Sequence, residues 1–308
     1  MAVQHTFPPP AATLRRAAGL AVLLAVPLVV AALVAGAEGI LPAGMVVMSA
    51  AVAPYCTKRQ AAGFMAALVL IGTAATAAVG HDVAVVLLVI LTCLAAGLAS
   101  RISAGIFGIA PVVVAVLALD ATGASPLQVG LIMAGVSAYV AVIIHVAKIH
   151  IPPAPVPLSA AVRHGVVMAA ACGTATVVAL RYDWPHSYWL VMTLAIVLRP
   201  YARDSLVRNR QRVLGTLAGA VLAVILSPLP RFWQILFAVI CMALVLSYIM
   251  LADYLLQVAF TTPMVVFLVS SGTLTDTLNM DALRVLYTVS ACAVGGALAL
   301  LLARQDDT

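Results

Sequence analysis

The sequence predicts an all-α polytopic membrane protein, and three observations carry that prediction. The chain has 308 residues, of which 65% are apolar and only 8% are charged, whereas a soluble domain has roughly a quarter charged residues. The apolar residues form continuous runs, unlike the alternating pattern of a membrane β-barrel. The basic residues fall in short segments between these runs, which is typical of membrane loops and does not indicate nucleic-acid binding.

Twelve apolar runs are expected to be transmembrane helices, in two sets of six. The runs span residues 17–36, 40–55, 61–79, 83–100, 104–119 and 128–147, and then 164–180, 187–199, 208–227, 232–250, 254–270 and 282–303. Several are shorter than the ~20 residues that a perpendicular helix needs, so we expect some to be tilted, broken or shielded by neighbours. Pro27, Pro42, Pro111 and Pro263 lie inside runs and should kink or interrupt them.

The first run admits two interpretations. Arg15-Arg16, an apolar stretch and Ala35-Gly36-Ala37 together resemble a secretory signal with its cleavage site. The run from Ala17 to Ala37 is longer than a usual signal core and another run follows at once, so we interpret it as the first transmembrane helix. Residues 1–13 are expected to form a disordered tail.

The distribution of basic residues predicts that both termini are cytoplasmic. With the N-terminus inside, the outer segments contain only Arg181, Arg231 and Arg284. The inner segments contain Arg15, Arg16, Lys58, Arg59, Arg101, Lys148, Arg163, Arg199, Arg203, Arg208, Arg210, Arg212 and Arg304. Positive charge concentrates on the cytoplasmic side of membrane proteins, and an even number of spans agrees with this orientation.

Weak internal similarity predicts two repeats of the same orientation, residues 14–150 and 163–304, joined by a proline-rich linker at 151–162. In each of four pairs, the first segment lies in the first repeat and the second in the second repeat. The pairs are Leu14-Arg15 with Val162-Arg163, Ala53-Pro54-Tyr55 with Arg199-Pro200-Tyr201, Leu70-Ile71-Gly72-Thr73 with Val213-Leu214-Gly215-Thr216, and Phe107 to Pro111 with Ala259 to Pro263. This pattern predicts a pseudo-twofold axis along the membrane normal, with a cavity between the halves.

The basic segment before the ninth run is the first candidate site. Arg199, Arg203, Arg208 and Arg212 are expected to line a cytoplasmic mouth that attracts an anionic substrate, because guanidinium binds carboxylate bidentately. The alternative is that they only set topology and contact lipid headgroups.

Helical spacing refines this candidate. With Asp204 or Ser205 as N-cap, Arg208 and Arg212 share one stripe with Gly215 and Gly219, and the glycines would allow another helix to approach closely.

Two further candidate sites concern opposite charges and prolines. Asp253 and Arg101 each lie ten residues before a proline, Pro263 or Pro111, so they are predicted to meet as an ion pair near the axis, or Asp253 to carry a proton. The alternative is that both are solvated in short loops.

Helices broken at equivalent prolines point to a transport site, where the hydroxyls of Thr261 and Thr262 would face substrate. The alternative is a simple kink. Tyr188 and Trp189 would stack on an aromatic substrate or anchor the chain at the membrane interface.

Enzymatic and cofactor chemistry is not predicted. No nucleophile–base pair or metal motif is present, and the five cysteines lie in or beside apolar runs without ligand spacing. Asp276 and Asp281 are expected to be solvated in one outer loop. We therefore expect no cofactor and no catalytic residue.

An ordered set of residues resembles a known family. The set is Arg163-His164-Gly165, Tyr188-Trp189, Thr193, Arg199-Pro200, Arg208, Arg212-Val213-Leu214-Gly215-Thr216, Gly219, Tyr254, Thr262-Pro263 and Arg284. It is similar to the membrane module of the fusaric acid resistance and aromatic acid exporter family, which plant aluminium-activated malate channels also resemble. The first half is covered only as a degenerate copy. It lacks counterparts of Arg208 and Arg212, because the repeat offset aligns Met65 and Val69 with them.

The resemblance implies a bacterial inner-membrane exporter of small, mainly aromatic, carboxylates that is driven by an ion gradient. Trp189, Thr193, Thr262 and Pro263 join the four arginines as implied substrate-binding residues. The expected partners are a small anionic substrate, the lipid bilayer and either a second copy of the chain or a periplasmic adaptor, and no nucleic acid. A passive anion channel and a non-transporting accessory subunit are the alternatives.

Overall fold

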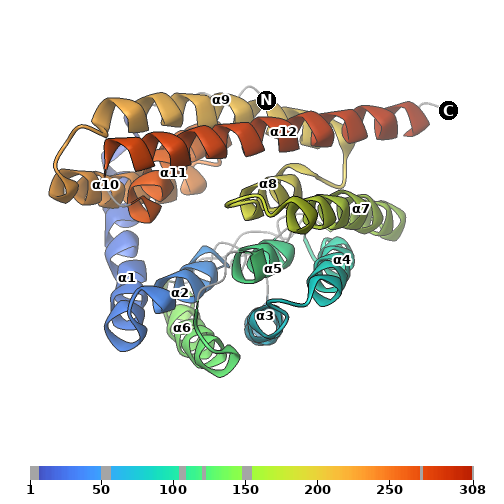
Figure 1. Cartoon of the computed structure of the whole chain (residues 1–308), viewed down its shortest axis with the longest axis horizontal. Helices are drawn as coiled ribbons and strands as arrows, with labels where there is room; N and C mark the ends of the chain where they lie inside the picture. Colours follow the sequence, from blue (N-terminus) through green and yellow to red (C-terminus); the bar gives the residue numbers. More distant parts are fainter. Residues whose placement is uncertain are drawn as a thin grey trace. The chain divides into compact units, whose positions relative to one another are not determined.

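A computed structural model describes residues 7–49, 57–103, 109–119, 123–147, 155–270 and 273–306. Each of the twelve apolar runs contains a helix in these ranges, and no strand occurs in them, which confirms the all-α prediction (Figure 1). The helices are α1 (Ala11–Ala35), α2 (Ala37–Ser49), α3 (Lys58–Ala77), α4 (Asp82–Ala99), α5 (Ile109–Leu119), α6 (Pro126–Ala147), α7 (Leu158–Tyr182), α8 (Tyr188–Val197), α9 (Ala202–Leu226), α10 (Arg231–Met250), α11 (Tyr254–Val269) and α12 (Leu274–Asp306).

Seven of the described helices are long and apolar enough to cross a membrane, namely α1, α3, α4, α6, α7, α10 and α12. The helices α2, α5, α8 and α11 are apolar but shorter. The first half of α9 carries four arginines, and this helix is not among the seven. The multi-pass membrane class therefore stands, whereas a total of twelve crossings stays a prediction.

The helices form two compact units. The first unit comprises residues 1–23 and 206–293, and the second comprises residues 24–205 and 294–308. These bounds differ from those of the two predicted repeats, whose arrangement about an axis stays a prediction. Residues 151–154 of the predicted linker lie outside the described residues, and α7 already begins at Leu158, within the predicted linker.

Two short helices lie at the core of the second unit. Every residue of α5 from Ala110 to Ala118 is buried, and α8 is buried along nearly its whole length. Helix α5 packs against α2, α3, α4 and α8 (Figure 1). A helix that is apolar on all sides is stable when neighbours surround it. Shielding by neighbours, one of the expected solutions, thus accounts for the shortness of α5 and α8.

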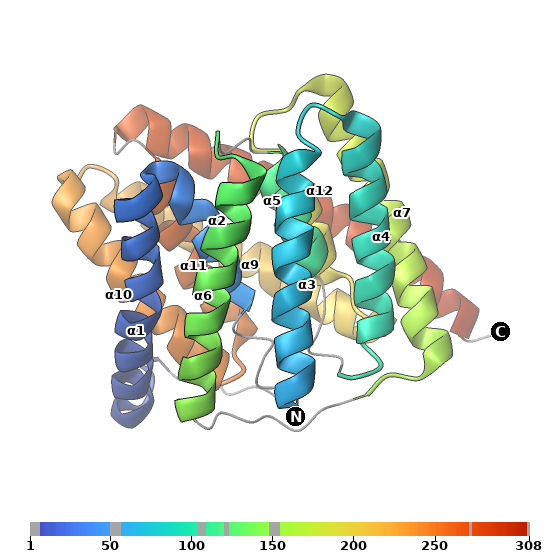
Figure 2. The same ribbon diagram turned by 90° about the horizontal axis from the view of Figure 1, so that it is seen from below.

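The contact between α4 and α7 depends on two glycines. A methyl group on Gly97 would lie 2.6 Å from the backbone nitrogen of Gly165 and 2.9 Å from the carbonyl oxygen of Ala161. Small residues let membrane helices approach until their backbones touch. The two helices, which run side by side in Figure 2, therefore meet where neither has a side chain.

The prolines do not break the helices in which they lie. Helices α1, α2 and α11 continue through Pro27, Pro42 and Pro263, so the predicted interruption at Pro263 is wrong. Pro111 is the third described residue of α5, which continues beyond it to Leu119.

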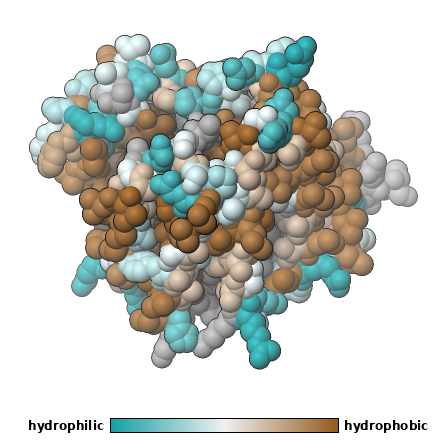
Figure 3. Space-filling model, turned by 60° about the horizontal axis from the view of Figure 1, so that its bottom comes forward, coloured by the Kyte–Doolittle hydropathy of each residue, from teal (hydrophilic) through white to brown (hydrophobic). Residues whose placement is uncertain are grey.

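Large apolar side chains remain exposed on several helices. They include Val29, Val30 and Leu33 of α1 and Phe232 and Trp233 of α10. Figure 3 shows apolar side chains over broad areas of one face. Such exposure is unusual for a soluble protein and fits contact with lipid.

The glycine contact between α4 and α7 yields a stability prediction. Gly97→Ala should destabilise the protein by roughly 1–3 kcal/mol through overpacking. The control is Gly135→Ala in α6, where a methyl group would meet nothing within 4 Å. It should be neutral or stabilising, because alanine favours the helix by roughly 0.5–1 kcal/mol over glycine. Thermal unfolding of both variants in detergent checks this, and equal melting temperatures would contradict the role of Gly97.

Candidate functional site

Helix α9 carries most of the candidate site, and its start differs from the prediction. It begins at Ala202, so neither Asp204 nor Ser205 is its N-cap. The hydroxyl of Ser205 accepts a hydrogen bond from the backbone nitrogen of Arg199 at 2.8 Å. This bond ties the end of the segment after α8 to the first turn of α9.

The glycine face of α9 packs directly on α11. Its spacing predicted a close contact with another helix but did not identify that helix. A methyl group on Gly215 would lie 2.7 Å from the carbonyl oxygen of Leu255 and 2.8 Å from Cβ of Val258. One turn later, a methyl group on Gly219 would lie 2.7 Å from Cβ of Thr262. The two backbones therefore touch over one full turn.

Pro263 contributes to this contact by lacking an amide hydrogen. In a regular helix, the residue at position 263 would donate to the carbonyl of Ala259. That carbonyl oxygen is the atom nearest to a methyl group built on Gly219. The hydroxyl of Thr262 donates within its own helix, to the carbonyl of Val258 at 3.1 Å. Thr262 and Pro263 therefore form the surface on which α9 packs.

Two arginines of α9 converge on one tyrosine of α11. The guanidinium carbon of Arg208 lies 3.1 Å from the ring centroid of Tyr254. Nη1 of Arg212 donates to the hydroxyl of the same Tyr254 at 3.4 Å. The ring of Tyr254 thus contacts one guanidinium, and its hydroxyl accepts a hydrogen bond from the other. A cation–π contact contributes roughly 0.5–2 kcal/mol, depending on its exposure to solvent, which offsets part of the repulsion between the two like charges.

A second row of polar side chains follows α9 beside this contact. Asn209, Arg212 and Thr216 are 7%, 5% and 1% exposed. Among the described residues, Nε of Arg212, both amide atoms of Asn209 and the hydroxyl of Thr216 have no hydrogen-bond partner. Buried polar groups nearly always find partners, and this row has hydrogen-bonding capacity that the described side chains do not use.

The other sequence-predicted substrate residues lie in the second unit. Arg199 is half-buried and Arg203 is exposed, so a single mouth formed by all four arginines stays a prediction. Trp189 is 1% exposed and stacks on His186 with ring centroids 5.7 Å apart, so it does not anchor the chain at a membrane interface. Thr193 is fully buried, and its hydroxyl has no partner among the described residues.

Asp253 has a structural role that the sequence analysis did not predict. It precedes α11 as its N-cap, and its Oδ1 accepts from the backbone nitrogen of Leu256 at 3.2 Å. Its side chain is 3% exposed. Arg101 is exposed and belongs to the second unit. The predicted pair of Asp253 with Arg101 therefore stays a prediction.

The expected outer loop before the last span is helical. Asp276 and Asp281 both lie on α12, and Asp281 is only 4% exposed, so the prediction of a solvated loop is wrong. Thr277, Asp281, Arg284 and Thr288 recur at helical spacing, and all four are buried. Helix α12 thus carries a polar stripe inside an otherwise apolar span.

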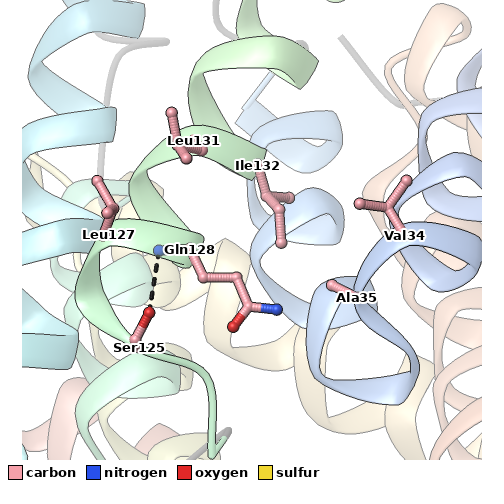
Figure 4. A pocket seen from close by; sticks show the side chains of 7 residues that line it. All are labelled: Val34, Ala35, Ser125, Leu127, Gln128, Leu131 and Ile132. Carbon is pink, nitrogen blue, oxygen red and sulfur yellow. Dashed lines mark hydrogen bonds between the residues drawn. The ribbon is translucent and has the colours of Figure 1, made fainter.

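A separate hollow of about 250 Å³ in the second unit contains none of the predicted residues. Figure 4 shows Val34 and Ala35 of α1 facing Gln128, Leu131 and Ile132 of α6 across it. No side chain that lines it carries a charge. It therefore lacks the chemistry that would hold an anion.

Comparison with known proteins gives one match. Residues 173–301 match the family described as fusaric acid resistance protein-like. No curated protein and no solved structure matches the chain. The matched segment includes all of α8 to α11, and so contains Arg208, Arg212, Tyr254 and Pro263. The resemblance seen in the sequence is thereby confirmed for residues 173–301.

Proposed function

We propose that this protein is an inner-membrane transporter that exports small organic acids, mainly aromatic carboxylates. The observation that carries the proposal is the buried charge of Arg212. Among the described residues its guanidinium makes a single hydrogen bond, to Tyr254, and it is 5% exposed. A buried cation without an anionic partner is costly, and a passing carboxylate would supply that partner.

The surroundings of Arg212 support an anion pathway. Arg208 stands one turn before it over Tyr254, and Arg203 is exposed at the start of the same helix. Arg208 and Arg212 share one face of the helix, whereas Arg203 lies about 180° from Arg212 around the axis. The two charges on the shared face would attract an anion. The fusaric acid resistance-like match over this segment supports transport as the activity.

An ion gradient, not ATP, is proposed to drive export, with both termini in the cytoplasm. The test uses the full chain in liposomes loaded with labelled benzoate. An exporter should require an imposed proton or sodium gradient to move benzoate uphill. Benzoate flux that only follows its own gradient would instead identify a passive channel, and no acid flux at all would overturn the proposal.

Arg212 should be essential for this flux. Arg212→Ala should lower benzoate transport by about tenfold or more, because a charged hydrogen bond contributes roughly 1.5–3 kcal/mol. Arg212→Lys should retain part of the activity, since it keeps the charge but not the guanidinium fork. Arg59→Ala, which removes an exposed arginine at the start of α3, is the control. Equal flux in all variants at equal expression would exclude this role.

The two functions of Tyr254 can be separated by substitution. Tyr254→Phe keeps the ring beneath Arg208 but removes the hydroxyl that accepts from Arg212. We expect normal thermal stability and a changed apparent affinity for benzoate. Tyr254→Ala removes both contacts and should also lower the melting temperature. If Tyr254→Phe unfolds like Tyr254→Ala, the hydroxyl contact is structural.

Substitution of Asp253 separates capping from charge. Asp253→Asn should keep the stability of the wild type, because asparagine caps helices as well as aspartate does, whereas Asp253→Ala should cost about 1 kcal/mol. Thermal unfolding measures both. A stable Asp253→Asn protein that loses transport would support the predicted pair with Arg101 or a proton-carrying role. Transport at the wild-type rate would exclude a role for the Asp253 charge in transport.

A further inference from the structure

A crevice of about 500 Å³ lies between α9 and α12, within the first unit. The side chains that line it are Asn209, Arg210, Val213 and Leu214 of α9 and Val289, Cys292 and Ala293 of α12. Its walls are mainly apolar, and its volume falls in the range of small-molecule sites, which is roughly 300–1,000 Å³.

The crevice adjoins the row of buried polar side chains on α9. Residues in a helix are separated by about 100° around the axis. Arg212 therefore lies next to the glycine face that contacts α11. Thr216 and Asn209 lie about 40–60° from Arg212 around the helix axis, on the side away from the glycines. Val213 lies about 40° beyond Asn209 in the same direction. Asn209 belongs both to the polar row and to the crevice lining, so one polar edge borders the apolar space.

Arg212 lies near the crevice along α9. Helical side chains lean toward the N-terminus of their helix, and the turn that carries Asn209 is about 4.5 Å from Arg212 in that direction along the axis. Both amide atoms of Asn209 and Nε of Arg212 have no hydrogen-bond partner among the described residues.

We propose that this crevice is a binding site for an amphipathic monocarboxylate. The carboxylate would accept hydrogen bonds from Arg212 and from the amide of Asn209, and the apolar body would lie between Val213 and Leu214 on one side and Val289 and Ala293 on the other. The proposal rests on the proposed transport function and deepens it, because it names the site that would select acids by their apolar size.

An acyl chain of a membrane lipid is the competing occupant, since Leu214 and Val289 are 45% and 43% exposed. The polar edge favours the acid. A lipid chain would fill the apolar space but leave the amide of Asn209 and Nε of Arg212 without partners, at the cost that buried unpaired groups carry.

The experiment compares acetate with hexanoate on the full chain in liposomes, by flux and by thermal stabilisation. In the wild type, hexanoate should show an apparent affinity about tenfold or more tighter than acetate, because each buried methylene adds roughly 0.8 kcal/mol. Ala293→Phe should fill the crevice and abolish this preference. Asn209→Leu should weaken the binding of both acids.

The matched control is Ala282→Phe, which adds the same bulk at an exposed position of α12 outside the crevice and should keep the preference for hexanoate. Leu214→Trp narrows the crevice from α9 and replaces Ala293→Phe as the test if that variant does not fold.

The possible outcomes separate the site from the transport function. If both crevice variants still transport acids and still prefer hexanoate, the transport function stands but the proposed site is wrong. Loss of co-purified lipid in Ala293→Phe, with the acid preference unchanged, would identify a lipid crevice and also overturn it. Absence of acid flux would overturn the transport function, and thermal stabilisation by hexanoate would then still decide whether the site exists.

Discussion

The contact between α9 and α11 is the constraint on which the candidate site depends. Gly215 and Gly219 let the backbones touch, and the carbonyl of Ala259, which has no amide donor at Pro263, faces Gly219. Contacts at this distance fix the separation of the two helices, and only then does Tyr254 lie within reach of Arg208 and Arg212. The glycines and arginines of α9 and the proline of α11 thus depend on one another, although they lie in different parts of the sequence.

The electrostatics of α9 follow from this packing. Like charges one turn apart repel each other, and burial within the protein increases the cost. The π-face and the hydroxyl of Tyr254 offset part of that cost. The charge of Arg212 is available to an anion, because its one hydrogen bond among the described residues is to the neutral hydroxyl of Tyr254.

Hydropathy and residue spacing predicted the elements well. Every apolar run contains a helix, and the spacing of Gly215 and Gly219 predicted a close helix contact, although not which helix would make it. The predictions failed where polar residues lie on a buried face. Asp276 and Asp281 lie on α12 and not in the predicted loop. Hydropathy counts every charged residue as polar and does not distinguish a buried helix face from an exposed one. Asn209 and Thr216 were missed for the same reason, although their i, i+3, i+7 spacing with Arg212 would have revealed the row. The role of Asp253 as a cap depends on the residue at which α11 begins. Helix boundaries are the feature that a sequence pattern predicts least well.

The spacing of Gly215 and Gly219 has a mechanical consequence. Only these two positions, one turn apart, admit the backbone of α11. A slide of α9 by one residue would press Leu214 and Ala218 toward it, and close-packed surfaces resist such gradual deformation. If α9 moves against α11 during a transport cycle, it should do so in whole helical turns, as a ratchet does. Arg208 and Arg212 would then leave Tyr254 together or not at all.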